Sequence, residues 1–207
     1  MTRAVPLAAL AAATLVVGSP ARAQSDVPVG FALGPAEASL VVIEFADFAC
    51  SACAEFARDT WPEVRARYVD SGRVRWIVVP FKLGFRNSDE GARAAYCAAE
   101  EERFWPMHDA LFAERGAWVG ERRPHDALAA IAASAGLDAA LFARCYDDHD
   151  RTERAIDDAN RAARAAGVRA TPTFLIGGVP VQGALPVEAF AGLLDAALAG
   201  GRPGGPS

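Results

Sequence analysis

The sequence predicts a single-domain α/β fold in which an all-helical segment interrupts a small sheet. Short apolar runs rich in β-branched residues occur on both sides of residues 87–167, and such runs are typical of strands buried on both faces of a sheet. Residues 87–167 themselves are rich in Ala, Glu, Asp and Arg, which indicates several helices. A chain of 207 residues is long enough for one domain with a substantial core.

The first 23 residues are typical of a cleavable secretory signal. Arg3 precedes an apolar run over residues 4–17, and a small-residue cleavage site ends at Ala23. The apolar run is shorter than the roughly 20 residues that a membrane-spanning helix needs. We therefore expect cleavage after Ala23, a mature domain over residues 24–199, a flexible tail over residues 200–207, and a periplasmic or secreted protein.

Charge and cysteine content restrict the partners and the compartment. Loss of Arg3 and Arg22 with the signal leaves 19 basic against 26 acidic residues, so the formal net charge moves from -5 to -7. This acidity argues against nucleic acid or an anionic membrane as the main partner. All four cysteines fall in the mature chain, and an even number suits an oxidising compartment.

The N-terminal half of the mature chain predicts a strand followed by a helix. Residues 24–37 are rich in Gly, Pro and small side chains and predict an extended lead-in. Residues 39–46 form an apolar run with almost no alternation, which predicts a buried strand interrupted by Glu44. Residues 50–69 then change to helical periodicity, and Pro62 is expected to kink or split that helix.

A second strand and the helical insertion come next. Residues 74–81 predict a strand parallel to the first, because a helix joins the two. In the insertion, Ser88 and Asp89 are the expected N-terminal caps of the first helix, and Asp138 is the expected cap of the helix that carries Cys145. The sequence predicts five helices in this segment.

The C-terminal part predicts a β-hairpin and a final helix. Two apolar runs, residues 173–176 and 179–182, flank a pair of glycines, which is a hairpin signal. Pro180 places the last strand at an edge of the sheet or at the start of a strand. Pro186 opens an amphipathic helix that completes the domain.

The sequence Cys50-Ser51-Ala52-Cys53 carries the clearest chemical signal. It follows the first strand directly and begins the helix, where unpaired backbone N–H groups stabilise a thiolate. A structural disulfide is the alternative, but a bridge across so short a loop stabilises a fold weakly. Zinc sites also use C-x-x-C. However, the three histidines are not spaced as a metal site with these cysteines, and we expect no metal.

The four cysteines allow three pairings. Local geometry favours Cys50 with Cys53, which leaves Cys97 with Cys145. The second pair can be a further redox centre or a permanent link between helices of the insertion. We favour the permanent link, because closing a loop of this length contributes roughly 4 kcal/mol and neither cysteine has a nearby resolving thiol.

The order of elements resembles the thioredoxin fold, and the helical insertion resembles the DsbA-like thiol:disulfide oxidoreductases. The resemblance covers about residues 33–198. Three segments carry it: residues 42–53 around the C-x-x-C sequence, Phe104-Trp105 with His108, and residues 170–174 around Thr171-Pro172. It implies a thioredoxin-like fold with an inserted all-helical subdomain, exchange of disulfides, and no diffusible cofactor. His108 is expected to serve packing.

The resemblance also implies roles for five residues. Cys50 is expected to be the nucleophile, exposed at the helix start, and Cys53 the resolving thiol that releases a mixed disulfide. Glu44 matches a buried acid that exchanges a proton with the inner cysteine; the alternative is an ordinary surface carboxylate. Thr171-Pro172 matches a cis-proline loop that presents its backbone to the substrate and keeps metal from the thiols, with a plain turn-breaking proline as the alternative.

The direction of electron flow stays open. Ser51-Ala52 lacks the histidine that stabilises the thiolate in the best known DsbA proteins, which predicts a weaker oxidant. Residues 24–38 are too short for the dimerisation domain of related isomerases, so we expect a monomeric oxidase. Its partners would be exported proteins with thiols or disulfides and a redox partner that resets the pair. A reductase or isomerase is the nearest alternative, and a metal-binding or chaperone-like protein is a more distant one.

Overall fold

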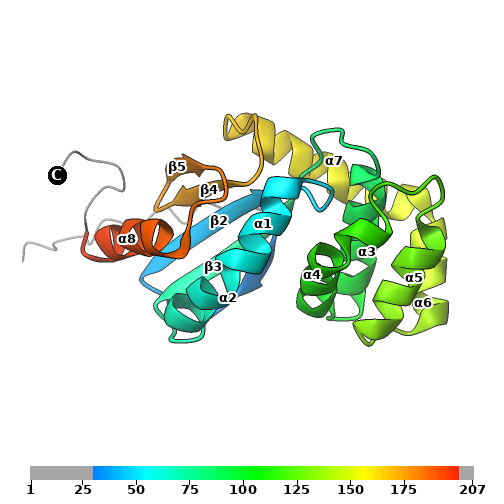
Figure 1. Cartoon of the computed structure of the whole chain (residues 1–207), viewed down its shortest axis with the longest axis horizontal. Coiled ribbons are helices and arrows are strands. Elements are labelled where there is room, and N and C mark those ends of the chain that lie inside the picture. The colour runs from blue at the N-terminus through cyan, green and yellow to red at the C-terminus, as the bar shows by residue number, and fades with distance from the viewer. Residues whose placement is uncertain (1–29, 201–207) are drawn as a thin grey trace, which may run out of the picture.

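The computed structural model describes residues 30–200 of the chain (Figure 1). The predicted signal and nearly all of the predicted tail lie outside these residues. A mixed sheet occupies one half of the molecule, and most helices of the insertion form the other half (Figure 1). Within the described residues, no helix combines the length and the apolar character that crossing a bilayer requires.

Across residues 30–200, the sheet has five strands in the order β1-β3-β2-β4-β5. The central strand β2 is parallel to β3 and antiparallel to β4, and β5 lies at an edge as Pro180 predicts. Both faces of the sheet are covered by helices, so β2 is buried along most of its length. The strands are β1 (Phe31–Leu33), β2 (Leu40–Ala46), β3 (Val74–Pro80), β4 (Thr173–Ile176) and β5 (Val179–Gln182).

Strand β1 is absent from the sequence prediction, which placed an extended lead-in there. Its three residues pair antiparallel with the edge of β3, with Ala32 opposite Ile77. A strand of this length between Gly30 and Gly34 has no measurable periodicity. Its formation depends on the open edge of β3, which is a tertiary feature.

The helix that follows β2 is divided as Pro62 predicts. Helix α1 (Ser51–Asp59) ends before Thr60, and α2 (Trp61–Val64) has Pro62 in its first turn, where a missing N–H costs no hydrogen bond. A π-helical turn (Arg65–Val69) continues it to β3. The Thr60 hydroxyl donates to the Leu185 carbonyl at 2.8 Å, which fixes the break against the segment before the last helix.

Five α-helices lie between β3 and β4, and we call them the helical insertion: α3 (Ser88–Glu100), α4 (Phe104–Ala113), α5 (His125–Ser134), α6 (Ala139–Asp147) and α7 (His149–Ala165). Asp138 caps α6 as predicted, since its carboxylate accepts the N–H groups of Ala140 and Leu141. The predicted capping of α3 by Ser88 and Asp89 is wrong. Asn87 occupies that position in a left-handed conformation without a capping bond, and the Ser88 hydroxyl bonds to Asp47 instead.

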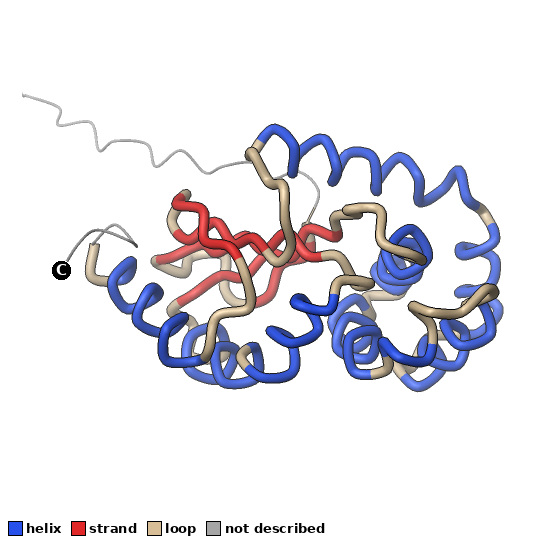
Figure 2. The backbone as a smooth tube through the Cα atoms, turned by 45° about the horizontal axis from the view of Figure 1, so that its top comes forward, coloured by secondary structure: helices blue, strands red, loops and turns tan. Residues whose placement is uncertain are grey.

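The two faces of the sheet carry different cores. Helix α7 crosses one face (Figure 2), where Ala159 and Ala163 belong to the same buried cluster as Phe45. The opposite face is covered by α1, α2 and α8 (Val187–Leu198), with a cluster of aromatic rings that includes Phe56 and Trp76. This second core continues into the insertion, so the sheet and the insertion form one folded unit around the start of α1.

Candidate active site

Cys50 and Cys53 lie where β2, α1 and the insertion meet. Cys50 precedes the first residue of α1 in an extended conformation, and Cys53 lies in the first turn. Both are free thiols. The expectation that Cys50 is exposed is wrong, because only 4% of its surface is accessible, and Cys53 is fully buried. The loop with Thr171 lies against the Cys50 sulfur, which is 3.4 Å from the Thr171 carbonyl oxygen and can donate to it when protonated.

The two thiols have opposite acidities. The pKa of Cys50 is lowered to about 5, first by a hydrogen bond from Cys53 and then by the Thr171 side chain and the N–H groups of Cys53 and Ala52, against the opposing effect of burial. The pKa of Cys53 is raised well above its ordinary value by burial, by its bond to Cys50 and by the charges of Cys50 and Glu44. At neutral pH the pair therefore holds one proton on Cys53 and a thiolate on Cys50.

Thr171 and Pro172 are joined by a cis peptide bond immediately before β4. The Pro172 carbonyl accepts the Gly183 N–H at 2.9 Å, which ties this loop to the end of the hairpin. The Thr171 hydroxyl is buried and has no partner that meets hydrogen-bond geometry, although its side chain favours the Cys50 thiolate. The loop therefore places one backbone carbonyl and one side chain against the reactive sulfur.

Glu44 lies on the central strand β2 with 3% of its surface accessible, so the surface-carboxylate alternative is wrong. Trp76 of β3 donates its indole N–H to Glu44 Oε2 at 2.9 Å. Burial raises the pKa of Glu44, while His108 and the Trp76 bond act in the opposite sense. A carboxyl group with a raised pKa near a thiol can take up and return a proton close to neutral pH.

His108 packs among aromatic side chains, including Phe48 and Trp105, with its ring almost completely buried. Its Nδ1 lies 2.8 Å from Asp109 Oδ1, whereas Nε2 is buried without a partner. His108 also lies close enough to Glu44 to affect its pKa. The sequence had suggested only a packing role for this residue.

Asp47 and Arg115 contact the loop before Cys50, and sequence reasoning singled out neither. The Asp47 carboxylate accepts the Ala49 N–H, and the Arg115 guanidinium donates to the Ala49 carbonyl. An Asp three residues before the C-x-x-C sequence is a recognisable turn signal, but nothing in the sequence near Arg115 points to this loop.

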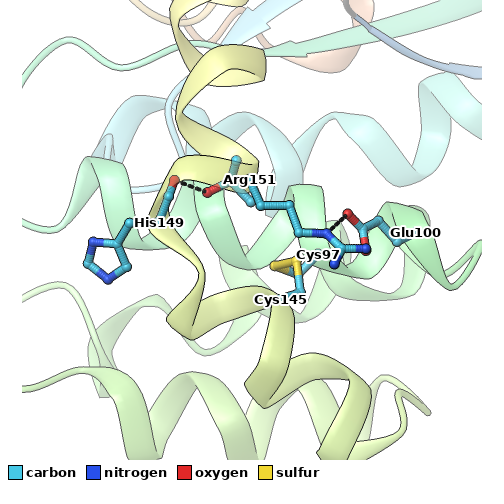
Figure 3. The surroundings of a disulfide bond; sticks show 6 residues. Cys97, Glu100, Cys145, His149 and Arg151 are labelled. Atoms are coloured by element: carbon cyan, nitrogen blue, oxygen red, sulfur yellow. Dashed lines mark hydrogen bonds and ion pairs between the residues drawn. A yellow bond between two sulfur atoms is a disulfide. The ribbon is translucent and has the colours of Figure 1, made fainter.

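Cys97 and Cys145 are joined by a disulfide between α3 and α6, 48 residues apart in the chain (Figure 3). Beside it, Arg151 of α7 donates two hydrogen bonds to the Glu100 carboxylate, at 2.7 and 2.6 Å (Figure 3). The disulfide and this ion pair together link three helices of the insertion.

Sequence comparison matches most of the chain to a known family and to named relatives. The family model described as Thioredoxin matches residues 26–196. A protein of Herminiimonas arsenicoxydans named Na(+)/H(+) antiporter NhaA is 32% identical over 169 residues, which cover 82% of this chain and 26% of that protein. A protein of Rickettsia conorii, provisionally named a protein-disulfide oxidoreductase, is 22% identical over 166 residues, which cover 80% of this chain and 59% of that protein.

Among solved structures, α-DsbA1 of Wolbachia pipientis superposes with a TM-score of 0.75 at 24% identity, covering 84% of this chain and 93% of that chain. At this identity the likeness establishes the fold. The chain spans about a quarter of the antiporter-named relative and less than two thirds of the Rickettsia protein.

Proposed function

The chain belongs to the thioredoxin family, and on that premise we propose that it is an exported, DsbA-like thiol:disulfide oxidoreductase that oxidises thiols of other exported proteins. The observation that carries the proposal is the contrast between Cys50, with a pKa lowered to about 5, and Cys53, with a raised pKa. Such a pair divides the two tasks of exchange between two sulfurs. The name of the Rickettsia conorii relative agrees with this activity.

The reaction begins from the form in which Cys50 and Cys53 are joined. A client thiolate attacks Cys50 Sγ, the bond between the two cysteines breaks, and Cys53 leaves as a thiolate that takes up a proton. A second client thiolate attacks the client sulfur of the mixed disulfide, and Cys50 leaves as a thiolate. The client loses two electrons and the Cys50/Cys53 pair gains them.

The neighbouring residues support these steps. Glu44, whose pKa is raised by burial, supplies the proton to the departing Cys53 thiolate and takes it back when the pair is reoxidised. The Thr171 carbonyl, 3.4 Å from Cys50 Sγ, is placed to accept a backbone N–H from an extended client segment. The chemistry uses sulfur and a carboxyl group alone, so no diffusible cofactor enters it.

The low pKa of Cys50 favours the oxidising direction. A stabilised thiolate makes the reduced pair more stable and Cys50 a better leaving group. Here hydrogen bonds supply that stabilisation, although Ser51-Ala52 contains no histidine. The experiment is the equilibrium of the Cys50/Cys53 pair with glutathione. We expect a potential well above the roughly -270 mV of thioredoxin, and a value in the thioredoxin range overturns the oxidase direction in favour of a reductase or isomerase.

Clients and the resetting partner can be captured with Cys53→Ala. This variant keeps the nucleophile but removes the thiol that resolves the mixed disulfide. We expect exported proteins, and a separate redox partner, to remain covalently attached to Cys50 on non-reducing gels. Cys50→Ala is the matched control and should retain none of them, and equal capture by both variants contradicts the proposal.

Export is the remaining part of the proposal. We propose a periplasmic or secreted location, on the basis of the signal-like sequence over residues 1–23. The intact mass of protein recovered from expressing cells tests it. Cleavage gives a chain that begins at Gln24, and retention of residues 1–23 in the functional protein contradicts export by this signal.

A further inference from the structure

Two charged side chains hold the backbone that leads into Cys50. Asp47 Oδ1 accepts the Ala49 N–H at 2.9 Å, and the Asp47 carbonyl accepts the Cys50 N–H at 2.9 Å. From the other side, Nε and Nη2 of Arg115 both donate to the Ala49 carbonyl, at 3.0 and 2.6 Å. Hydrogen bonds therefore fix the Ala49 N–H, the Ala49 carbonyl and the Cys50 N–H, which are the polar backbone groups immediately before the Cys50 side chain.

Both side chains anchor this loop to the helical insertion. Arg115 begins a short 3-10 turn (Arg115–Ala117) directly after α4. Asp47 is 2% exposed, and its Oδ2 accepts the Ser88 hydroxyl at 2.7 Å at the start of α3 and the Leu83 N–H at 2.8 Å in the preceding loop. Among the described residues, Arg115 is the one cationic side chain that hydrogen-bonds residues 47–53.

The backbone conformation at Cys50 determines which donors its sulfur meets. Cys50 has φ -72 and ψ 129 and points its sulfur back toward the first turn of α1. The Cys53 thiol and the Ala52 and Cys53 N–H groups, which lower the pKa of Cys50, are fixed in that turn. The Ala49 carbonyl belongs to the peptide group that ends at Cys50 N, so rotation of this peptide moves the sulfur relative to those donors. A guanidinium beside the peptide also favours a nearby anion.

We propose that Asp47 and Arg115 form a clamp through which the helical insertion sets the position of Cys50, and that Arg115 is a positioning residue for disulfide exchange. The inference rests on the proposed function, because it concerns the same thiol. It gives the insertion an indirect part in the chemistry, through the backbone before Cys50. A displacement of residues 115–117 changes the stability of the Cys50 thiolate without any contact with the sulfur.

The test measures the reduced thiol itself in the full-length protein. Thiolate absorbance at 240 nm, followed against pH, reports the pKa of Cys50. Arg115→Gln removes the charge and the paired donors, so we expect this pKa to rise by about 1. A rise of about 1 in this pKa makes the reduced pair about tenfold less stable, relative to the oxidised pair, at neutral pH. The reduction potential of the Cys50/Cys53 pair should therefore fall by about 30 mV. Arg115→Lys keeps the charge but not the paired donors and should give a smaller rise.

Arg122→Gln is the matched control, because it removes the same charge from an exposed position of the next loop. It should leave the pKa and the potential unchanged. A folded Arg115→Gln protein with wild-type pKa and potential overturns the clamp. Should that variant fail to fold, Arg115→Lys decides: a raised Cys50 pKa supports the clamp and an unchanged one overturns it. A wild-type Cys50 with an ordinary thiol pKa overturns the proposed function, independently of the variants.

Discussion

The protein contains two pairs of cysteines that are equally buried and chemically opposite. Cys50 and Cys53 are 4% and 0% exposed, and Cys97 and Cys145 are 1% and 4% exposed. The first pair consists of two free thiols, whereas the second is closed as a disulfide. Burial therefore does not distinguish the free pair, which we propose to be the reactive one, from the bonded pair.

The difference lies in the hydrogen-bond donors around each sulfur. The Cys50 thiolate is favoured first by the hydrogen bond from the Cys53 thiol. Cys50 also precedes the first turn of a helix, where backbone N–H groups have no partner within the helix, and two of them add to this stabilisation. Cys97 and Cys145 lie inside α3 and α6, where the N–H groups are used by the helices themselves. The surroundings of Cys50 therefore stabilise a thiolate, whereas the backbone around Cys97 and Cys145 offers no free N–H group, which suits a permanent bond.

The largest expected effect separates the pairs by activity. Cys50→Ala removes the sulfur that forms the mixed disulfide, so oxidation of a reduced client peptide should fall to the uncatalysed rate. The double variant Cys97→Ala/Cys145→Ala leaves the thiolate and its donors in place and should still oxidise the peptide. Loss of turnover in the double variant, with its fold intact by circular dichroism, contradicts the separation.

The second effect separates the pairs by stability. Removing the Cys97–Cys145 bond frees a loop that spans 48 residues, and the unfolded chain then gains entropy worth about 4 kcal/mol. Urea unfolding of Cys97→Ala/Cys145→Ala under non-reducing conditions should show a loss of this order. Cys50→Ala/Cys53→Ala is the control, and it should lose less, because its bridge closes a much shorter loop. Equal losses would remove the structural distinction.

Sequence reasoning located the reactive pair because its chemistry depends on near neighbours. A strand, a C-x-x-C sequence and a helix are adjacent in the chain, so spacing indicated the two cysteines, while the role of Glu44 on that same strand followed from the resemblance to the DsbA-like proteins. The pairing of Cys97 with Cys145 followed by elimination. The sequence therefore predicted most of the sheet, all five helices of the insertion, and the residues to which we assign the exchange.

Long-range packing determines what could not be predicted. The Thr171 carbonyl reaches Cys50 across 121 residues and buries it, which made the expected exposure wrong. Arg115 reaches Ala49 across 66 residues. Strand β1 forms because β3 has a free edge with which it can pair. Ser88 does not cap α3, because its hydroxyl donates a hydrogen bond to the buried Asp47 carboxylate. In each case a partner distant in the chain overrides the local signal.

The third effect concerns the proton that only the reactive pair exchanges. Glu44→Gln retains an acceptor for the Trp76 N–H but cannot carry the proton to and from Cys53. The step that breaks or reforms the Cys53 bond should slow about 100-fold, the lower range for general acid–base catalysis. Stopped-flow fluorescence of the reduction step measures it. Glu55→Gln makes the same charge change at an exposed position of α1 and should have no effect; comparable slowing by both variants contradicts a relay through Glu44.

The fourth effect is a pH dependence that belongs to Cys50. Its pKa is about 5 in the folded, reduced protein and 9.0 for an ordinary thiol. A group with a depressed folded pKa contributes no stability below that value. The stabilisation of the folded state by the Cys50 thiolate grows as the pH rises from 5 to 9 and is complete above the unfolded pKa. It is lost as the pH falls back through this range. The slope is at most about 1.4 kcal/mol per pH unit. Cys53, with its raised pKa, opposes this only above the same window, and the Cys97–Cys145 disulfide does not titrate.

Comparison of wild type with Cys50→Ala isolates this contribution. With the active-site thiols reduced and the other disulfide intact in both proteins, Glu44 and Asp47 titrate in each. The part of the Asp47 pKa shift that the Cys50 charge causes is lost with Cys50, so it belongs to the measured difference. The difference in unfolding free energy should increase in favour of the wild type as the pH rises from 5 to 8. A difference that stays flat across this range would mean that the folded protein does not stabilise the Cys50 thiolate. The two cysteine pairs would then differ only in whether their sulfurs are joined, and not in the hydrogen-bond donors around those sulfurs.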